Sequence, residues 1–189
     1  MKRCLTIAGG LAAAFVVCAC AHEPTPLPPV RQVELPRFMG DWFVIAHVPS
    51  RVERNAYNAV ETYALDAKGH VQTTFRFRNG SFDAPLKTMT PTGYVQPATN
   101  NAVWGMQFVW PIRAEYVIAY LASDYRTTIV GRSKRDYAWI MARSPTLADS
   151  EYEALLQRLE AMGYDRASVR RVPQRWPESR DDRRQPGGD

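Results

Sequence analysis

Eight short segments of this 189-residue sequence alternate apolar and polar residues, and turns separate them. In the segment 71–78, Val71, Thr73, Phe75 and Phe77 share one face, because strand side chains point alternately to opposite sides. With no helical pattern between them, the segments predict an all-β antiparallel meander. Eight meander strands can close into an up-and-down barrel that leaves no exposed edge. The predicted strands are 42–48, 59–65, 71–78, 86–95, 102–110, 116–121, 127–131 and 137–143.

The first predicted strand follows a bend at Gly40, which has no Cβ to resist it. Alternation then places Trp42, Val44, Ala46 and Val48 together on the inner face. Trp42 is the first large side chain on that face. We therefore expect Trp42 to form the floor of whatever the barrel encloses.

The inner faces of the later strands are rich in aromatic residues. An eight-stranded barrel has room for one small ligand, and ligand pockets are mostly apolar with a few placed polar groups. These side chains either line such a pocket or simply fill the core. The candidate ligand-binding residues are Phe75, Phe77, Trp104, Met106, Phe108, Tyr116, Ile118, Tyr120, Tyr137 and Trp139.

One α-helix is predicted after the last strand, with Asp149 as its N-cap and Gly163 as its stop. A single amphipathic helix needs a surface to cover, and the outer wall of the barrel provides one. Its apolar stripe is Tyr152, Leu155, Leu156, Leu159 and Met162. The barrel and this helix together make a domain over residues 36–173.

The first nineteen residues have the composition of a lipoprotein signal peptide: a positive start, then an apolar run too short to span a bilayer comfortably. The run ends Val17-Cys18-Ala19-Cys20, which resembles a bacterial lipobox. Cys20 fits the lipidated position better than Cys18, because the small residue Ala19 precedes it. A plain secretory signal is the alternative.

The segments that flank the predicted domain are rich in proline, glycine or charge. Residues 20–35 are proline-rich and predict an extended tether; the stretch from Cys20 to Phe38 reaches at most about 55 Å in polyproline geometry. Residues 177–189 predict a disordered tail.

Composition argues against several function classes. All three cysteines lie within the first twenty residues, so the domain has no disulfide, thiol nucleophile or cysteine metal site. The net charge of +5 includes no basic run in the domain, which argues against nucleic-acid binding. His47 and His70 lack metal-ligand spacing. We predict no metal, no cofactor and no catalytic residue.

Two glutamates, Glu61 and Glu115, could still have a chemical role, because both lie within predicted strands. An inward carboxylate would be a buried acid with a raised pKa and a candidate general acid. An outward carboxylate would simply be solvated. The sequence leaves both readings open for each residue.

Three motifs, in order, resemble those of the lipocalin family. Gly40 and Trp42 match its G-x-W motif, and Ser123-Asp124-Tyr125 stands where the family has Thr-Asp-Tyr. Arg143 stands where the family has an arginine at the end of the eighth strand. A guanidinium on the face of Trp42 would be a favourable cation–π contact, and its other donors are expected to bond carbonyls of the turn 123–126.

With the lipobox, the sequence resembles the bacterial outer-membrane lipoprotein lipocalins in particular. The resemblance implies a barrel held on the outer membrane through Cys20, facing the periplasm, that stores or transports a fatty acid or lysophospholipid without being an enzyme. Alternatives are a lipid or isoprenoid isomerase and a ligand-free envelope interaction protein; a homodimer is left open. An anionic headgroup would favour a basic mouth, with Arg51, Arg54, Arg76, Arg78 and Lys87 as candidates.

Overall fold

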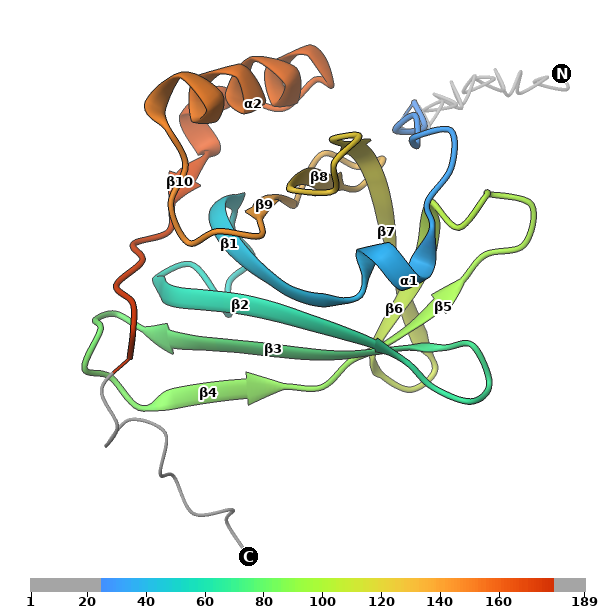
Figure 1. The fold of residues 1–189 in the computed structure, drawn as a ribbon, viewed down its shortest axis with the longest axis horizontal. Coiled ribbons are helices and arrows are strands. Elements are labelled where there is room, and N and C mark those ends of the chain that lie inside the picture. The colour runs from blue at the N-terminus through green and yellow to red at the C-terminus, as the bar shows by residue number, and fades with distance from the viewer. Residues whose placement is uncertain (1–24, 179–189) are drawn as a thin grey trace, which may run out of the picture.

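Each long strand pairs with its neighbours in sequence, and the first strand also pairs with the last, so the sheet closes on itself (Figure 1). The computed structural model describes residues 25–178. The strands are β1 (Gly40–Val48), β2 (Ala56–Leu65), β3 (Val71–Asn79), β4 (Leu86–Met89), β5 (Thr92–Val95), β6 (Val103–Val109), β7 (Ile112–Leu121), β8 (Thr127–Gly131) and β9 (Ala138–Ala142). The predicted eight-stranded antiparallel barrel is confirmed.

The strands β4 and β5 together take the place of one barrel strand. Both pair with β3, and the break between them contains Pro91. Proline has no N–H to give to a ladder, so a strand is interrupted where it occurs. The predicted signal peptide, the predicted lipidation site Cys20 and residues 179–189 of the predicted tail lie outside the described part of the chain.

A shift in the pairing of β1 with β9 overturns part of the predicted inner face. The register changes between Val44 and Ala46. Trp42 and Val44 lie inside the barrel, whereas Ala46 and Val48 pack in the outer cluster beneath the C-terminal helix. Strict alternation therefore placed Ala46 and Val48 on the wrong side, because one extra residue in a strand reverses every face that follows it.

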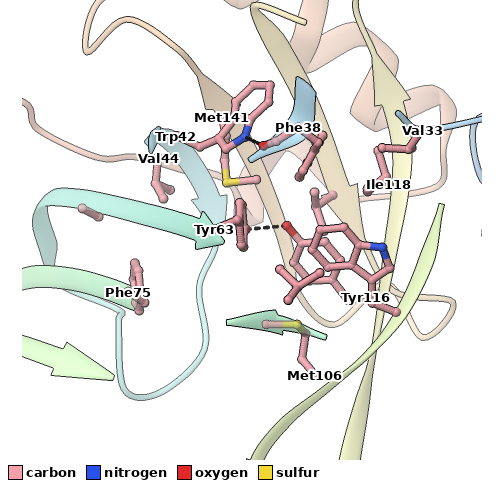
Figure 2. Close-up of a cluster of buried hydrophobic side chains, with 14 of the residues drawn as sticks. Val33, Phe38, Trp42, Val44, Tyr63, Phe75, Met106, Tyr116, Ile118 and Met141 are labelled. Carbon is pink, nitrogen blue, oxygen red and sulfur yellow. Dashed lines mark hydrogen bonds between the residues drawn. The ribbon is translucent and has the colours of Figure 1, made fainter. Parts of the chain in front are cut away.

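The connections divide between the two ends of the barrel. The β1–β2, β3–β4, β6–β7 and β8–β9 connections lie at one end, which we call the open end. The other end is closed by a short helix that the sequence did not predict, α1 (Leu35–Phe38). Phe38 is fully buried, and its carbonyl accepts a hydrogen bond of 2.8 Å from Trp42 Nε1 (Figure 2).

Arg143 holds this closed end together. Its guanidinium carbon lies 3.8 Å from the centroid of the Trp42 ring, as the motif predicted. Its Nη atoms donate to the carbonyls of Arg37, Phe38, Met39 and Asp41, at 2.7 to 3.0 Å. The expected bonds to the turn 123–126 are thus wrong, because the end of α1 presents carbonyls that have no partner within the helix.

Gly40 is placed against the same guanidinium. Its φ of +89° lies in the region that side chains disfavour. A Cβ at this position would come 3.5 Å from Arg143 Nη1. That distance is an ordinary van der Waals contact, so the positive φ at the bend into β1, rather than the approach of Arg143, is what favours glycine here.

The segment before α1 is packed on the barrel, which corrects the expectation of a free spacer up to Phe38. Leu27 is 3% exposed and Val33 is fully buried. Val30 N donates to the carbonyl of Ile118 at 2.9 Å, and Val33 N to that of Asn100 at 3.0 Å. Only the chain before Thr25 remains for a tether.

The C-terminal helix α2 (Asp149–Ala161) covers the outer wall, as predicted. Its N-cap is Ala148 rather than the expected Asp149, which is the first helical residue. Leu155, Leu156 and Leu159 pack in the outer cluster. After α2, a 3₁₀ turn, η1 (Arg166–Ser168), leads to β10 (Arg170–Arg171), which pairs with β1.

We predict that Arg143→Lys lowers the free energy of unfolding by about 3 kcal/mol, because lysine cannot reproduce a forked set of donors over an indole ring. Urea unfolding at pH 7 measures the change. Arg37→Lys is the control, since Arg37 belongs to the same helix and its side chain is 47% exposed. A loss equal to that of the control would show that Arg143 does not hold the closed end.

Candidate functional site

A cavity of about 330 Å³ occupies the barrel between its plugged floor and the open end. Apolar side chains make up most of its wall, from β3, β4, β6, β7 and β9. The floor is an aromatic cluster in which Phe38 and Tyr63 both meet Trp104 edge to face, with ring centroids 5.5 and 5.7 Å apart. The cavity begins where this packing ends.

The structure brings six of the ten predicted ligand-binding residues to the cavity wall: Phe75, Met106, Phe108, Tyr116, Tyr137 and Trp139. Three others, Phe77, Trp104 and Ile118, point inward but are packed in the filled core. Tyr120 is on the outer wall instead, where Arg158 of α2 lies 4.6 Å from its ring. A register shift between Ile118 and Tyr120 explains this exception.

Glu61 points into the cavity, and the sequence had left its direction open. Its carboxylate accepts a hydrogen bond from the Tyr63 hydroxyl, which lies 2.5 Å from the hydroxyl of Tyr116 (Figure 2). Glu61 is 8% exposed. Burial raises the pKa of Glu61 to about 7, opposed by the bond from Tyr63 and assisted by the charge of Glu53.

Burial also raises the pKa of Tyr63 and of Tyr116 well above the usual value for tyrosine, and the nearby carboxylate of Glu61 adds to the effect. Both hydroxyls therefore keep their protons around neutral pH. The three groups form a continuous polar network on an otherwise apolar floor.

A second carboxylate, Glu53, lies in the β1–β2 connection and also faces the cavity. Its Oε2 accepts a 3.2 Å hydrogen bond from Trp139 Nε1 and lies 3.8 Å from His47 Nδ1; its Oε1 accepts from Ser50 N. Burial alone would raise the pKa of Glu53, but His47, Trp139 and Ser50 together outweigh burial and lower it. Glu53 is thus a buried, ionised carboxylate that sequence patterns did not reveal.

Two further polar groups in the wall have unused hydrogen-bonding atoms. Thr73 is 3% exposed, and its Oγ1 has no partner among the described residues. Arg132 lines the wall; its Nη1 bonds to Asp136 at 3.1 Å, while its buried Nε has no partner there.

The basic mouth expected from sequence differs from the one observed. Arg132 is the basic residue of the described wall. The expected residues, Arg51, Arg54, Arg76, Arg78 and Lys87, do not line the cavity.

Glu115 has the opposite orientation to Glu61. It lies between Ala114 and Tyr116 on β7, and all three residues border the cavity. Its carboxylate accepts hydrogen bonds of 2.7 Å from both N and Oγ of Ser133. Glu115 is therefore a structural acceptor that ties β7 to the β8–β9 loop.

The rim of the open end is markedly apolar. Phe108 and Trp110 are 52% and 82% exposed, and Phe108 also lines the cavity. The register of β6 with β7 shifts between Met106 and Val109, next to this hairpin. Other exposed apolar residues of the rim are Val52, Val109 and Ile112.

The described residues contain no group of three histidine, cysteine or acidic side chains placed to hold a metal ion. No helix among residues 25–178 is long and apolar enough to cross a membrane. The arrangement suits the binding of an elongated apolar molecule that carries a polar group.

Comparison with known proteins identifies the family. Residues 33–174 match the model of the lipocalin-like domain. The chain is a lipocalin. It is 28% identical over 166 residues to the outer membrane lipoprotein Blc of Citrobacter freundii, covering 86% of this chain and 93% of that one. Temperature-induced lipocalin-1 of Arabidopsis thaliana is 25% identical, over 80% and 85% of the two chains.

Solved structures support the same fold. Insecticyanin from the tobacco hornworm Manduca sexta superimposes on this lipocalin with a TM-score of 0.60 at 19% identity, over 77% of this chain and 83% of that one. At that identity the similarity concerns the fold alone.

The buried Glu61 predicts a pH-dependent stability. Its pKa of about 7 in the folded chain exceeds the ordinary value of 4.5, so the folded state holds the proton more tightly. Protonated Glu61 therefore contributes about 3 kcal/mol to the free energy of unfolding. This contribution is complete below pH 4.5 and is lost as the pH rises through 7.

Urea unfolding at pH 5 and pH 8 tests this prediction. The free energy of unfolding should fall over this interval in the wild type and stay nearly level in Glu61→Gln, which cannot titrate. Glu151→Gln, an exposed glutamate on α2, should retain the wild-type fall. An equal fall in Glu61→Gln would contradict the assignment.

Proposed function

We propose that this lipocalin binds a single-chain lipophile, such as a fatty acid or lysophospholipid, within its barrel, and stores or transports it in the bacterial cell envelope. The observation that carries the proposal is the apolar cavity of about 330 Å³ beneath an open mouth. Small-molecule sites typically have volumes of about 300 to 1,000 Å³. Burial of each methylene group of a chain contributes about 0.8 kcal/mol.

The proposed place of action is the periplasmic side of the outer membrane, with Cys20 as the lipidated residue. Two relatives that this chain resembles over most of its length are named outer membrane lipoproteins. The sequence Ala19-Cys20 after an apolar run supports the same placement. A membrane-held carrier is physically reasonable because free lipid monomers are nearly insoluble.

We propose further that the ligand leaves chemically unchanged. The competing function is a lipid or isoprenoid isomerase, and Glu61 is the observation that favours it, because an acid with a pKa of about 7 suits proton transfer. Against it, Glu61 is already bonded to Tyr63 on the floor of the cavity.

Native mass spectrometry of the chain from Glu23 onward, purified without detergent, tests the binding function. We expect an adduct that extracts as a lipid and is at least ten-fold depleted in Ala114→Phe, which fills the cavity at a wall position. Thr74→Phe, on the outer face of β3, should retain the adduct.

Three results would count against the carrier function. A wild-type chain that carries no adduct and takes up no added lipid would indicate a filled barrel and an interaction protein. An adduct retained in Ala114→Phe would place the ligand outside this cavity. Conversion of an added lipid that Glu61→Gln abolishes would establish the isomerase.

A further inference from the structure

We propose that the cavity binds the ammonium group of a lipophilic amine, with the carboxylates of Glu53 and Glu61 as its counter-charges. The inference rests on the proposed lipid-binding function and narrows its ligand to one chemical class. It departs from the fatty acid expected from sequence, because a carboxylate ligand would have to enter a cavity that already holds two carboxylates.

The charged groups around the cavity are unevenly distributed. Glu53 and Glu61 are 4% and 8% exposed and come from the β1–β2 connection and from β2. Arg132 is the basic residue of the described wall, and Asp136 already neutralises it at 3.1 Å. Charges interact several-fold more strongly in a poorly solvated site than in water. The interior therefore attracts a cation and repels an anion.

The remaining titratable neighbours do not reverse this balance. Glu115 at the rim adds negative charge, although Ser133 holds its carboxylate. Tyr63 and Tyr116 face Glu61 as protonated hydroxyls. His47 Nδ1 lies 3.8 Å from Glu53 Oε2, but His47 does not line the cavity.

Aromatic ring faces complete the site. The rings of Tyr116 and Trp139 stack with centroids 6.4 Å apart, and both line the cavity. Their polar atoms are already engaged, because Trp139 Nε1 donates to Glu53 and the Tyr116 hydroxyl pairs with Tyr63. Tyr116 also stacks on Trp104, with ring centroids 5.0 Å apart. The half-buried Trp139 therefore offers the aromatic surface for a ligand, and an indole ring favours a cation.

Thr73 supplies an independent indication of a ligand. Its hydroxyl is buried in the wall and has no partner among the described residues, although buried polar groups are nearly always hydrogen-bonded. A primary ammonium carries three donors and no acceptor. It can therefore donate to Thr73 Oγ1 as well as to a carboxylate.

Calorimetric titration with dodecylammonium, dodecanoate and dodecanol tests the proposal at one chain length. The protein is the chain from Glu23 onward, which contains every described contact. At pH 8 we expect dodecylammonium to bind at least ten-fold more tightly than dodecanoate. Glu61→Gln should reduce this ratio at least five-fold, and Glu151→Gln, on the exposed face of α2, should leave it unchanged.

The outcomes separate the two proposals. If none of the three compounds binds, both the lipid-binding function and the ammonium site are wrong. If all three bind equally, or dodecanoate binds best, only the ammonium site is wrong. Should Glu61→Gln fail to fold, the wild type at pH 5 replaces it, with dodecanol as the reference because neither dodecanol nor dodecylammonium changes its charge between pH 5 and pH 8. Protonation of Glu61 must then lower the preference for dodecylammonium over dodecanol, and an unchanged preference overturns the proposal.

A different observation carries a second inference: we infer that the rim of the open end rests on a phospholipid bilayer. Six large apolar side chains are exposed in the described chain, and all but Leu65 belong to this rim. Val52 and Phe108 also line the cavity, so the apolar surface continues from the interior onto the rim. Tryptophan at such a position, here Trp110, suits a membrane interface.

The path of the chain favours a bilayer over a second copy of the protein as the occupant. Arg135 Nη1 donates to the carbonyl of Thr25, and Leu27 N donates to Ser133 Oγ. The described chain thus begins beside the β8–β9 loop, one of the connections at the open end. The proposed anchor Cys20 is five residues earlier, at most about 18 Å of extended chain. A bilayer that holds Cys20 therefore lies within reach of this end.

Fluorescence quenching by brominated phospholipids tests this contact. The full lipidated chain is reconstituted into vesicles of phosphatidylethanolamine and phosphatidylglycerol. We expect Trp110→Phe to remove at least half of the quenching. Trp176→Phe, at a half-buried tryptophan that packs on Phe43, should leave the quenching unchanged. Equal quenching in the wild type and in Trp110→Phe would overturn the inference. The inference would also be overturned if the protein formed a dimer that Ile112→Ser disrupts, because the rim would then bind a second copy.

Discussion

The contact of Arg143 with Trp42 determines where the cavity of this lipocalin begins. The guanidinium covers the indole face and donates to four carbonyls around α1. It thereby fixes the helix that carries Phe38 under the barrel, and Phe38 supports Tyr63 and Trp104. These rings fill the lower barrel, so the polar network at Glu61 lies on their upper surface. A change at Arg143 would therefore alter the floor of the binding site as well as the stability of the fold.

Alternation of residue types was sufficient to predict the barrel, because it reports which segments are strands. It was insufficient to predict faces along a whole strand. Register shifts after Val44 and Ile118 each change the side to which later residues point. For this reason Tyr120 was wrongly placed inside. A shift leaves no mark in composition, since it depends on the strand across the ladder.

Glu61 and Glu115 show how far the alternation of side chains along a strand can predict the direction of a carboxylate. Tyr116 was predicted to line the barrel, and alternation then requires its neighbour Glu115 to face outward, as observed. That signal was present in the sequence. Glu61 was ambiguous, because both faces of β2 carry apolar residues. Glu53 was beyond prediction, since it lies in an irregular connection and meets Trp139 from the far end of the chain.

Burial of Glu61 is costly for a protein that needs only to be stable. A carboxylate whose pKa is raised to about 7 by burial destabilises the folded state at neutral pH. An apolar side chain of similar volume would avoid this cost and would also improve an interior meant only for hydrocarbon. The hydroxyl of Thr73, which has no hydrogen-bond partner among the described residues, adds a second cost in the same wall. Both costs decrease when a cation occupies the cavity, because it supplies the missing counter-charge and donor. The features that are least favourable in the empty barrel are thus the ones that an ammonium ligand would satisfy.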